Sequence, residues 1–127
     1  MPRAVIAAHG ELAAGLCSAV ERVAGRGGAF VALSNTGLGP AEIEAQLRTA
    51  LAEVGDLVVF TDLPAGSCTL AARRLQRELP GLTVVTGANL SMLLAYALSS
   101  ASPAEAARVA VTKGTAAVAH HGGTDGG

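Results

Sequence analysis

Aromatic side chains are scarce in this sequence. Its 127 residues contain two Phe, one Tyr and no Trp, so a platform that stacks nucleic-acid bases or sugar rings can hardly be built from them. An excess of positive charge is also missing, because nine Lys and Arg stand against ten Asp and Glu and leave a net charge of −1. The composition therefore disfavours nucleic acid as a partner and a lectin-like cleft for sugar.

Long hydrophobic runs and paired cysteines are absent as well. No stretch of about 18 apolar residues could span a bilayer, and the apolar run after Arg3 is too short for a secretory signal peptide. Cys17 and Cys68 match neither a Cys-x-x-Cys motif nor a zinc-binding spacing. We expect a cytoplasmic protein that does not insert into the membrane and holds no metal ion or other cofactor.

Four short apolar runs alternate with segments of helical periodicity. The runs cover residues 4–8, 30–33, 57–61 and 82–86, and their lack of strict alternation is typical of strands buried on both faces of a parallel sheet. Between them, apolar residues recur at spacings of three and four. These residues are Leu12, Leu16, Ala19, Val20 and Val23, then Ile43, Leu47, Ala50, Leu51 and Val54, then Leu70, Leu75 and Leu79. The pattern predicts a doubly wound α/β fold with a mainly parallel four-stranded sheet, order 2-1-3-4, and helices on both faces.

The length and composition predict one domain. Half of the residues are hydrophobic, which suits a single modest core and not a disordered chain. Residues 90–98, and a segment from Pro103 to about Lys113, predict two more helices. The small residues 114–119 leave two interpretations open, a late edge strand that pairs with a partner subunit or a frayed end. The domain is therefore expected at residues 1–119, followed by a disordered tail at 120–127.

Polar residues follow the predicted strands, and in open α/β sheets ligands bind at the carboxyl ends of strands, beside the point where strand order reverses. His9 follows the first strand and Asp62 follows the third. If these strands are neighbours, the carboxylate can accept a hydrogen bond from one ring nitrogen and leave the other as a nucleophile. The alternatives are a loop or helix-capping role for His9 and, equally for Asp62 taken alone, a loop-capping role. The pairing is what points to chemistry.

An anion site is predicted next to this pair. Gly66 and Ser67 open the helix after the third strand, where free backbone N–H groups and the helix dipole favour negative charge and the hydroxyl adds a donor. The alternative is an ordinary N-cap, and the two roles are compatible. Together with His9 and Asp62, these residues describe a nucleophilic imidazole that faces a phosphoryl group. No glycine-rich nucleotide-binding loop is present in the sequence.

Three loop motifs occur in order along the chain. They are Ala8-His9-Gly10, then Thr61-Asp62-Leu63-Pro64-Ala65-Gly66-Ser67-Cys68, then Gly87-Ala88-Asn89-Leu90-Ser91-Met92-Leu93. Through about the first 100 residues, the motifs and their spacing resemble the IIA component of the mannose family of bacterial sugar phosphotransferase systems.

This resemblance implies a phosphotransferase that relays a phosphoryl group as phosphohistidine during sugar uptake. His9 would accept the group from the carrier protein HPr and pass it to a IIB component, while Asp62 orients the ring. The implied site residues are catalytic His9, Asp62 and Ser67, phosphoryl-binding Ala65, Gly66 and Ser67, and wall-forming Gly10, Asn89 and Met92. The resemblance also implies a homodimer and leaves association with a permease open.

The loop after the third strand departs from the family pattern. Pro64 stands where an aromatic residue is usual, Ala65 where the first of two glycines is usual, and Cys68 where a proline is usual. Ala65 cannot adopt a positive φ cheaply, so a different loop geometry is expected, although the backbone amide donors remain. Cys68 is interpreted as a packing substitute, with a redox role as the alternative.

Three other functions stay open. The phosphotransferase subunit of a dihydroxyacetone kinase system has a similar fold and a strand-end histidine, but its usual Met-Gly-Ser sequence is missing here. A regulator that reads phosphorylation state could use the same domain. A small metal chelatase would need a second imidazole or clustered carboxylates beside His9, and the other two histidines lie in the tail, at positions 120 and 121.

Overall fold

The four apolar runs form one parallel sheet in the computed structural model, which describes residues 1–124. The strands are β1 (Ala4–Ala8), β2 (Phe30–Ser34), β3 (Val58–Thr61) and β4 (Thr83–Val85). Their order is β2-β1-β3-β4, and every neighbouring pair is parallel. The predicted order 2-1-3-4 is confirmed. The central strand β1 is buried along its whole length, which explains why its sequence is continuously apolar.

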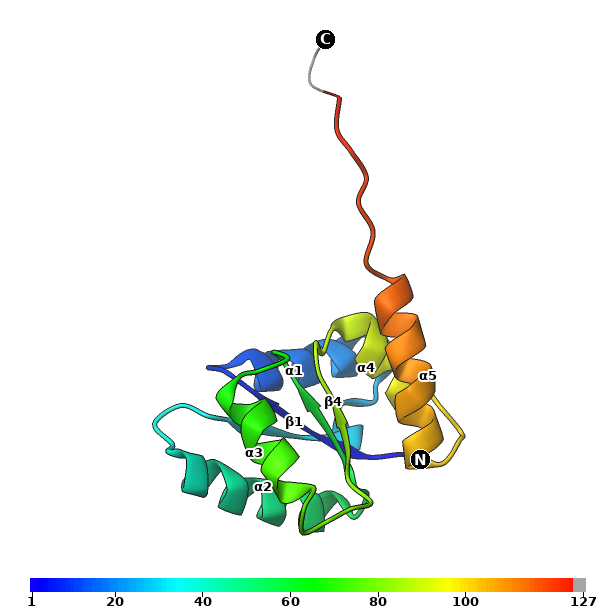
Figure 1. Cartoon of the computed structure of the whole chain (residues 1–127). Helices are drawn as coiled ribbons and strands as arrows, with labels where there is room; N and C mark the ends of the chain where they lie inside the picture. The colour runs from blue at the N-terminus through cyan, green and yellow to red at the C-terminus, as the bar shows by residue number, and fades with distance from the viewer. Residues whose placement is uncertain (125–127) are drawn as a thin grey trace.

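Helices cover both faces of this sheet (Figure 1). They are α1 (Leu12–Ala24), α2 (Pro40–Val54), α3 (Ser67–Leu75), α4 (Leu90–Ala97) and α5 (Pro103–Ala116), with a 3₁₀ turn at Gly27–Ala29. Helices α1, α4 and α5 pack on one face, and α2 and α3 pack on the other. The doubly wound arrangement expected from the alternating pattern is therefore present. None of the described helices is long and apolar enough to cross a bilayer.

Local sequence signals set the helix ends. Helix α2 begins at Pro40, and the Glu42 carboxylate accepts the N–H of Gly39 at 3.1 Å. Asn89 caps α4 by accepting the N–H of Met92 at 3.0 Å. Such caps satisfy N–H groups that have no partner inside the helix. Each of these two helices begins a few residues after the carboxyl end of a strand.

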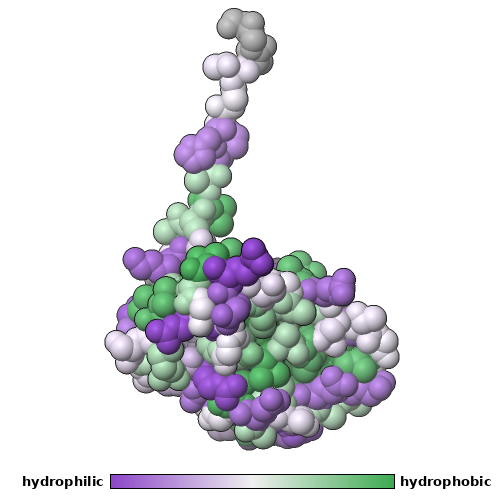
Figure 2. All heavy atoms as spheres, turned by 180° about the vertical axis from the view of Figure 1, so that it is seen from behind, coloured by the Kyte–Doolittle hydropathy of each residue, from purple (hydrophilic) through white to green (hydrophobic). Residues whose placement is uncertain are grey.

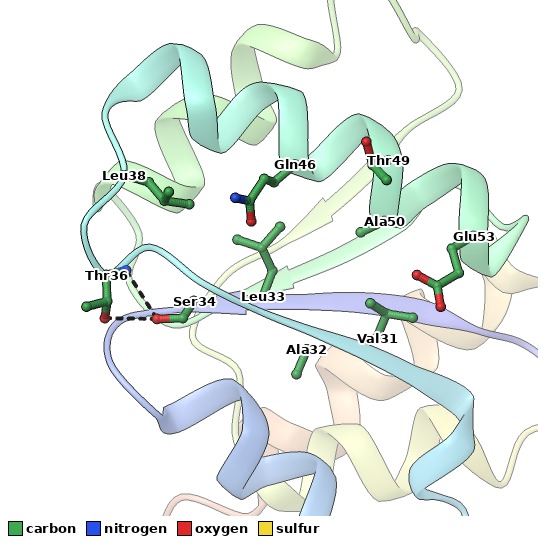
Figure 3. A pocket seen from close by; sticks show the side chains of 10 residues that line it. All are labelled: Val31, Ala32, Leu33, Ser34, Thr36, Leu38, Gln46, Thr49, Ala50 and Glu53. Atoms are coloured by element: carbon green, nitrogen blue, oxygen red, sulfur yellow. Dashed lines mark hydrogen bonds between the residues drawn. The ribbon is translucent and has the colours of Figure 1, made fainter.

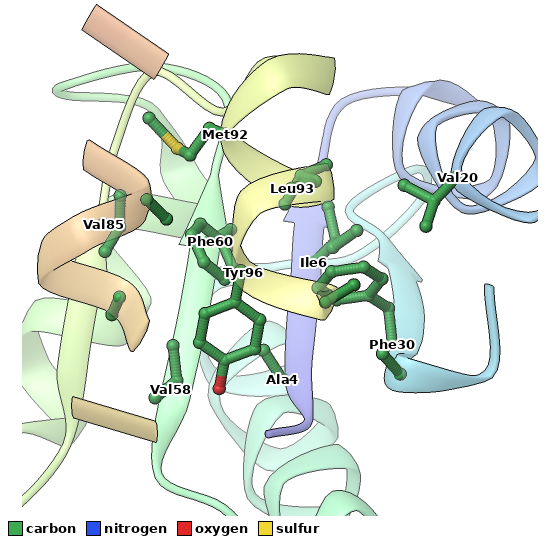
Figure 4. Close-up of a cluster of buried hydrophobic side chains, with 14 of the residues drawn as sticks. Ala4, Ile6, Val20, Phe30, Val58, Phe60, Val85, Met92, Leu93 and Tyr96 are labelled. Atoms are coloured by element: carbon green, nitrogen blue, oxygen red, sulfur yellow. The ribbon is translucent and has the colours of Figure 1, made fainter. Parts of the chain in front are cut away.

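All three aromatic residues lie in the core on the α4 side of the sheet (Figure 4). The Phe60 ring meets Tyr96 edge-on with centroids 5.0 Å apart, and Phe30 meets Phe60 in the same way at 6.3 Å. The Tyr96 hydroxyl donates to the carbonyl oxygen of Arg3 at 2.7 Å. Because the aromatic side chains are used in packing, none is left on the surface to stack on a ligand.

Helix α1 buries only part of the face expected from its periodicity. Leu12 and Val23, expected on the buried face, are exposed, whereas Ala13 and Val20 are buried. Leu16 and Ala19 are partly buried, so the expected face is confirmed in its middle and wrong at its two ends. Leu70 of α3, also expected inward, is exposed as well.

The segment after α5 also differs from expectation. Helix α5 runs through Ala116, so residues 114–116 are helical and the open suggestion of an edge strand at 114–119 is wrong for this chain. Gly114 is buried and lies against Met92 of α4. Residues 117–124 are exposed, contain no helix or strand, and project from the body; Figure 2 shows apolar residues at the base of this projection. The rest of the expected tail, 125–127, lies outside the described residues.

Candidate functional site

His9 and Asp62 meet at the carboxyl ends of two neighbouring strands. Strands β1 and β3 pair with Ala7 opposite Thr61, so the residues that follow them emerge at the same edge. Asp62 Oδ2 lies 2.8 Å from His9 Nδ1 and accepts the His9 backbone N–H at 3.0 Å. The His9 side chain is 47% exposed and that of Asp62 only 10%. The expected pairing is present, with the ring reachable and the carboxylate beneath it.

A tight turn holds the histidine in this position. Gly10 has a φ of +58°, a left-handed conformation that favours glycine. The turn closes where the N–H of Leu12 donates to the carbonyl oxygen of His9 at 3.2 Å. Gly10 therefore contributes to the site by shaping the backbone beside His9.

The electrostatics of the pair favour an ionised carboxylate. Burial acts to raise the pKa of Asp62, but the hydrogen bonds from the His9 backbone and ring outweigh it and hold the pKa below its ordinary value. A neutral imidazole that donates from Nδ1 to this carboxylate keeps its lone pair on Nε2. The other carboxylate oxygen, Oδ1, is buried without a hydrogen-bond partner within residues 1–124, so Asp62 depends mainly on His9 for compensation of its charge.

The start of α3 lies directly against the imidazole. A Cβ atom built on Gly66 would stand 3.0 Å from Cε1 of His9. Glycine has no Cβ and therefore avoids this close contact. Gly66 is the N-cap residue and Ser67 the first residue of the helix. The first N–H groups of a helix lack intrahelical partners and attract anions. The ring thus stands beside a set of donors suited to a phosphoryl group.

Two buried threonines hold the loop between β3 and α3. Thr61 Oγ1 and Thr69 Oγ1 are 2.6 Å apart, and the Thr69 hydroxyl donates to the carbonyl oxygen of Leu63. No residue other than glycine has a positive φ in the described part of the chain, so Ala65 occupies the loop without that strain. The altered residue at this position is compatible with the backbone that presents Gly66.

Cys68 lies in the core under this loop. Its side chain is fully buried in the cluster between the sheet and helices α2 and α3. Burial raises the pKa of the Cys68 thiol, and the negative charge of Asp62 raises it further, so the thiolate is disfavoured despite the helix start. This environment matches the packing interpretation of Cys68.

Asn35 was not assigned a role from the sequence, although it follows β2 at the same edge of the sheet. Its side-chain Nδ2 donates to Ser67 Oγ at 2.8 Å. The contact joins residues 32 positions apart. The only sequence signal for it was a polar residue directly after a strand of an open α/β sheet.

Asn89 and Met92 both contact helix α5. Asn89 Nδ2 lies 3.4 Å from the carbonyl oxygens of Gly87 and Gly114, and the Met92 side chain packs beneath Gly114. Both residues line a hollow that Val111 and Val118 border. The structure thus brings His9, Asp62, Gly66 and Ser67 into one region, while the role of Asn89 and Met92 as a site wall stays a prediction.

A separate hollow lies between the free edge of β2 and helix α2 (Figure 3). Val31, Leu33 and Glu53 are among the residues around it. His9 and Asp62 do not border it, and its walls carry a single carboxylate. Across residues 1–124, no group of three or more His, Cys, Asp or Glu side chains is placed to hold a metal ion.

Fold and site together define a class of protein. It is an open α/β protein with a parallel sheet. A half-exposed histidine, hydrogen-bonded to a carboxylate, lies where the strand order reverses, beside the N-terminus of a helix.

Comparisons with known proteins agree with this class. The family model described as "PTS system fructose IIA component" matches residues 3–121. The mannose/sorbose-specific IIA subunit of the phosphotransferase system from Enterococcus faecalis is 25% identical, with a TM-score of 0.81 over 98% of this chain and 97% of that one. The phosphotransferase system component EIIA from Streptococcus agalactiae has the same fold, at 23% identity and a TM-score of 0.83, covering 94% of this chain and 97% of that one. No curated protein matches significantly.

The chain belongs to the fructose IIA family of the phosphotransferase system. The family resemblance inferred from the three loop motifs is confirmed. Proteins of this family are phosphotransferases that carry phosphohistidine, and membership assigns the chain to the phosphoryl relay of sugar uptake.

Proposed function

We propose that His9 is the phosphohistidine of this protein, accepting a phosphoryl group from the carrier protein HPr and passing it to a IIB component. The observation that carries the proposal is the 2.8 Å contact between His9 Nδ1 and Asp62 Oδ2 on a ring that remains 47% exposed. One nitrogen is held and the other is free to reach a docked partner. The expected cytoplasmic location and homodimer stay predictions.

The transfer is a displacement at phosphorus. The Nε2 lone pair of His9 forms a bond to phosphorus while the P–N bond of the donor histidine breaks, and the donor nitrogen keeps the electron pair. The attacking nitrogen carries no proton, so none has to leave His9. The phosphorylated ring is positively charged while Nδ1 keeps its proton, and the ionised Asp62 stabilises that charge across the existing hydrogen bond. The second transfer runs the same displacement toward the acceptor on IIB.

The start of α3 would stabilise the phosphoryl oxygens. The backbone N–H groups of Ala65, Gly66 and Ser67 and the Ser67 hydroxyl supply donors beside the His9 ring. In phosphoryl transfer the charge spreads over three equatorial oxygens, and fixed donors aimed at them lower the barrier. The helix dipole acts in the same direction.

Radioactive phosphoenolpyruvate with enzyme I and HPr tests the assignment. The wild-type protein should acquire an acid-labile, base-stable phosphate, and His9→Gln should acquire none. A variant with both His120→Gln and His121→Gln is the matched control and should be labelled like the wild type. Label that persists in a folded His9→Gln would overturn the proposal.

Asp62→Asn tests the orienting role. This variant should fold and still accept label, but at a rate lower by roughly tenfold or more, because the amide gives less charge compensation to the phosphorylated ring. Equal rates would remove Asp62 from the mechanism.

The downstream partner separates transport from the alternatives. Phosphorylated protein should transfer its label to a IIB component encoded beside it. Transfer to a dihydroxyacetone kinase subunit, or stable binding to a partner without transfer, would instead favour the kinase or the regulator.

A further inference from the structure

Asn35 connects the three loops at the candidate site. Its backbone N–H donates to the carbonyl oxygen of Ala8 at 3.2 Å, directly before His9. Its own carbonyl oxygen accepts the N–H of Leu38 at 3.0 Å, which closes the turn after β2. Its side-chain Nδ2 donates to Ser67 Oγ at 2.8 Å. The residue is therefore anchored to the end of β1 by its backbone and to the start of α3 by its side chain.

The direction of the Asn35–Ser67 hydrogen bond decides where the serine proton points. A serine hydroxyl has one proton and two lone pairs, and an amide NH₂ group can only donate. When Nδ2 occupies one lone pair of Ser67 Oγ, the hydroxyl proton has to point elsewhere. The adjacent thiol of Cys68 is only a weak acceptor. The proton is thus left for a stronger acceptor at the same helix start.

The phosphoryl group on His9 would be that acceptor. Gly66 lies against the imidazole, with its built Cβ 3.0 Å from Cε1, and Ser67 is the next residue. A free hydroxyl would have to reorient when negative charge arrives, whereas a hydroxyl fixed by a neighbour is already aimed. A supporting hydrogen bond from a neighbouring residue holds the hydroxyl in this orientation before the phosphoryl group arrives.

We propose that Asn35 is a positioning residue that orients the Ser67 hydroxyl as a donor to the phosphoryl group on His9. This inference rests on the proposed function of His9. It adds a residue that acts through Ser67 and does not itself touch the transferred group.

A double-mutant cycle on phosphoryl transfer tests the inference. Single-turnover rates from preformed phospho-HPr would be measured for the wild type, Asn35→Leu, Ser67→Ala and the double variant. Asn35→Leu keeps the side-chain size but cannot donate, and should lower the maximal rate roughly three- to tenfold with little change in the half-saturating HPr concentration. Ser67→Ala should lower the maximal rate by roughly tenfold or more. In the Ser67→Ala background, Asn35→Leu should change the rate by less than about twofold.

Thr36→Ala is the matched control in the same loop. It removes the hydrogen bond from Ser34 Oγ to Thr36 Oγ1, which is 2.9 Å long, and leaves Ser67 untouched. Its transfer rate should equal that of the wild type. Urea unfolding of every variant shows that the rates compare folded proteins, and Asn35→Ala replaces Asn35→Leu if the larger side chain prevents folding.

Two outcomes would overturn the role of Asn35. One is an unchanged maximal rate in the folded Asn35 variant. The other is an equal loss of rate with and without Ser67, which would mean that Asn35 acts independently of the hydroxyl. Labelling of His9→Gln is a different failure, because it removes the proposed phosphohistidine itself.

Discussion

The contact between Gly66 and the His9 ring makes Gly66→Ala a direct probe of the proposed site. The added Cβ would stand 3.0 Å from His9 Cε1 and 3.4 Å from Leu63 Cβ. The Gly66 backbone, with φ −79° and ψ 173°, is one that any residue adopts. The steric demand therefore falls on the His9 ring.

The size of the effect follows from these distances. Carbon atoms pack best at about 3.5–4.0 Å, so the ring has to move by roughly half an ångström while the 2.8 Å bond to Asp62 restrains Nδ1. A misplacement of about 1 Å lowers rates by about 10², which predicts a roughly tenfold loss here. The free energy of unfolding should change little. Alanine at an N-cap lowers it by about 1 kcal/mol, and the reduced flexibility of the unfolded chain raises it by about 0.4–1 kcal/mol.

Single-turnover transfer from phospho-HPr and urea unfolding measure the two quantities. Gly15→Ala is the control, because Gly15 lies within α1 and no atom approaches its built Cβ within 4 Å. It should raise the free energy of unfolding by about 0.5–1 kcal/mol and leave transfer unchanged. A wild-type rate in Gly66→Ala would refute the reasoning, since it would mean that the ring does not rest against the helix start during transfer.

Three further predictions concern stability. The pKa of Asp62 is lowered in the folded protein, so its carboxylate stabilises the fold above the unfolded pKa of about 4 and this contribution disappears as pH falls through the lower folded value. Urea unfolding from pH 7 to pH 3 should thus show a larger loss for the wild type than for Asp62→Asn, and parallel profiles would contradict this. Gly114→Ala places a Cβ 2.7 Å from Met92 Cβ and should lower the free energy of unfolding by about 1–2 kcal/mol after the gain in helix propensity; an unchanged urea midpoint would argue against this packing. Tyr96→Phe removes the donor to the Arg3 carbonyl oxygen and should lower the free energy of unfolding by about 1 kcal/mol. Calorimetry of the variant and the wild type can check this.

The sheet could be predicted from the sequence because burial on both faces leaves a strong signal. The first run, residues 4–8, coincides with β1 (Ala4–Ala8), and the other three differ from the observed strands only at their ends. The pairing of His9 with Asp62 followed from the strand order alone, since β1 and β3 are neighbours in the sheet. Topology thus placed the two principal residues of the candidate site together.

Contacts between distant side chains could not be predicted in this way. The hydrogen bond from Asn35 to Ser67 depends on how the turn after β2 meets the start of α3, and neither periodicity nor composition encodes that meeting. The ends of the buried face of α1 were misjudged for a related reason, because helical periodicity alone does not show that Ala13 is buried while Leu12 and Val23 are exposed.

Gly114 shows how tertiary packing overrides a local preference. Glycine is unfavourable inside helices, and the small residues around it suggested a strand or a frayed end. In the structure this glycine lets α5 approach Met92 of α4, where any Cβ would clash. Met92 lies 22 positions earlier in the sequence, so this close approach is a tertiary contact. It accounts for a glycine inside the helix, which continues through this position to Ala116.

The departures in the loop after β3 are compatible with the proposed site, because the loop keeps the one glycine that faces the imidazole. Of the two small residues before the helix, Gly66 contacts the imidazole, while Ala65 needs no positive φ. Cys68 fills a buried space in the core at the first turn of α3. The missing aromatic residue at Pro64 removes no donor to the phosphoryl group. The proposed relay needs oriented N–H and O–H donors beside a nucleophilic ring, and the backbone and Ser67 hydroxyl of this loop are the groups we propose for that role.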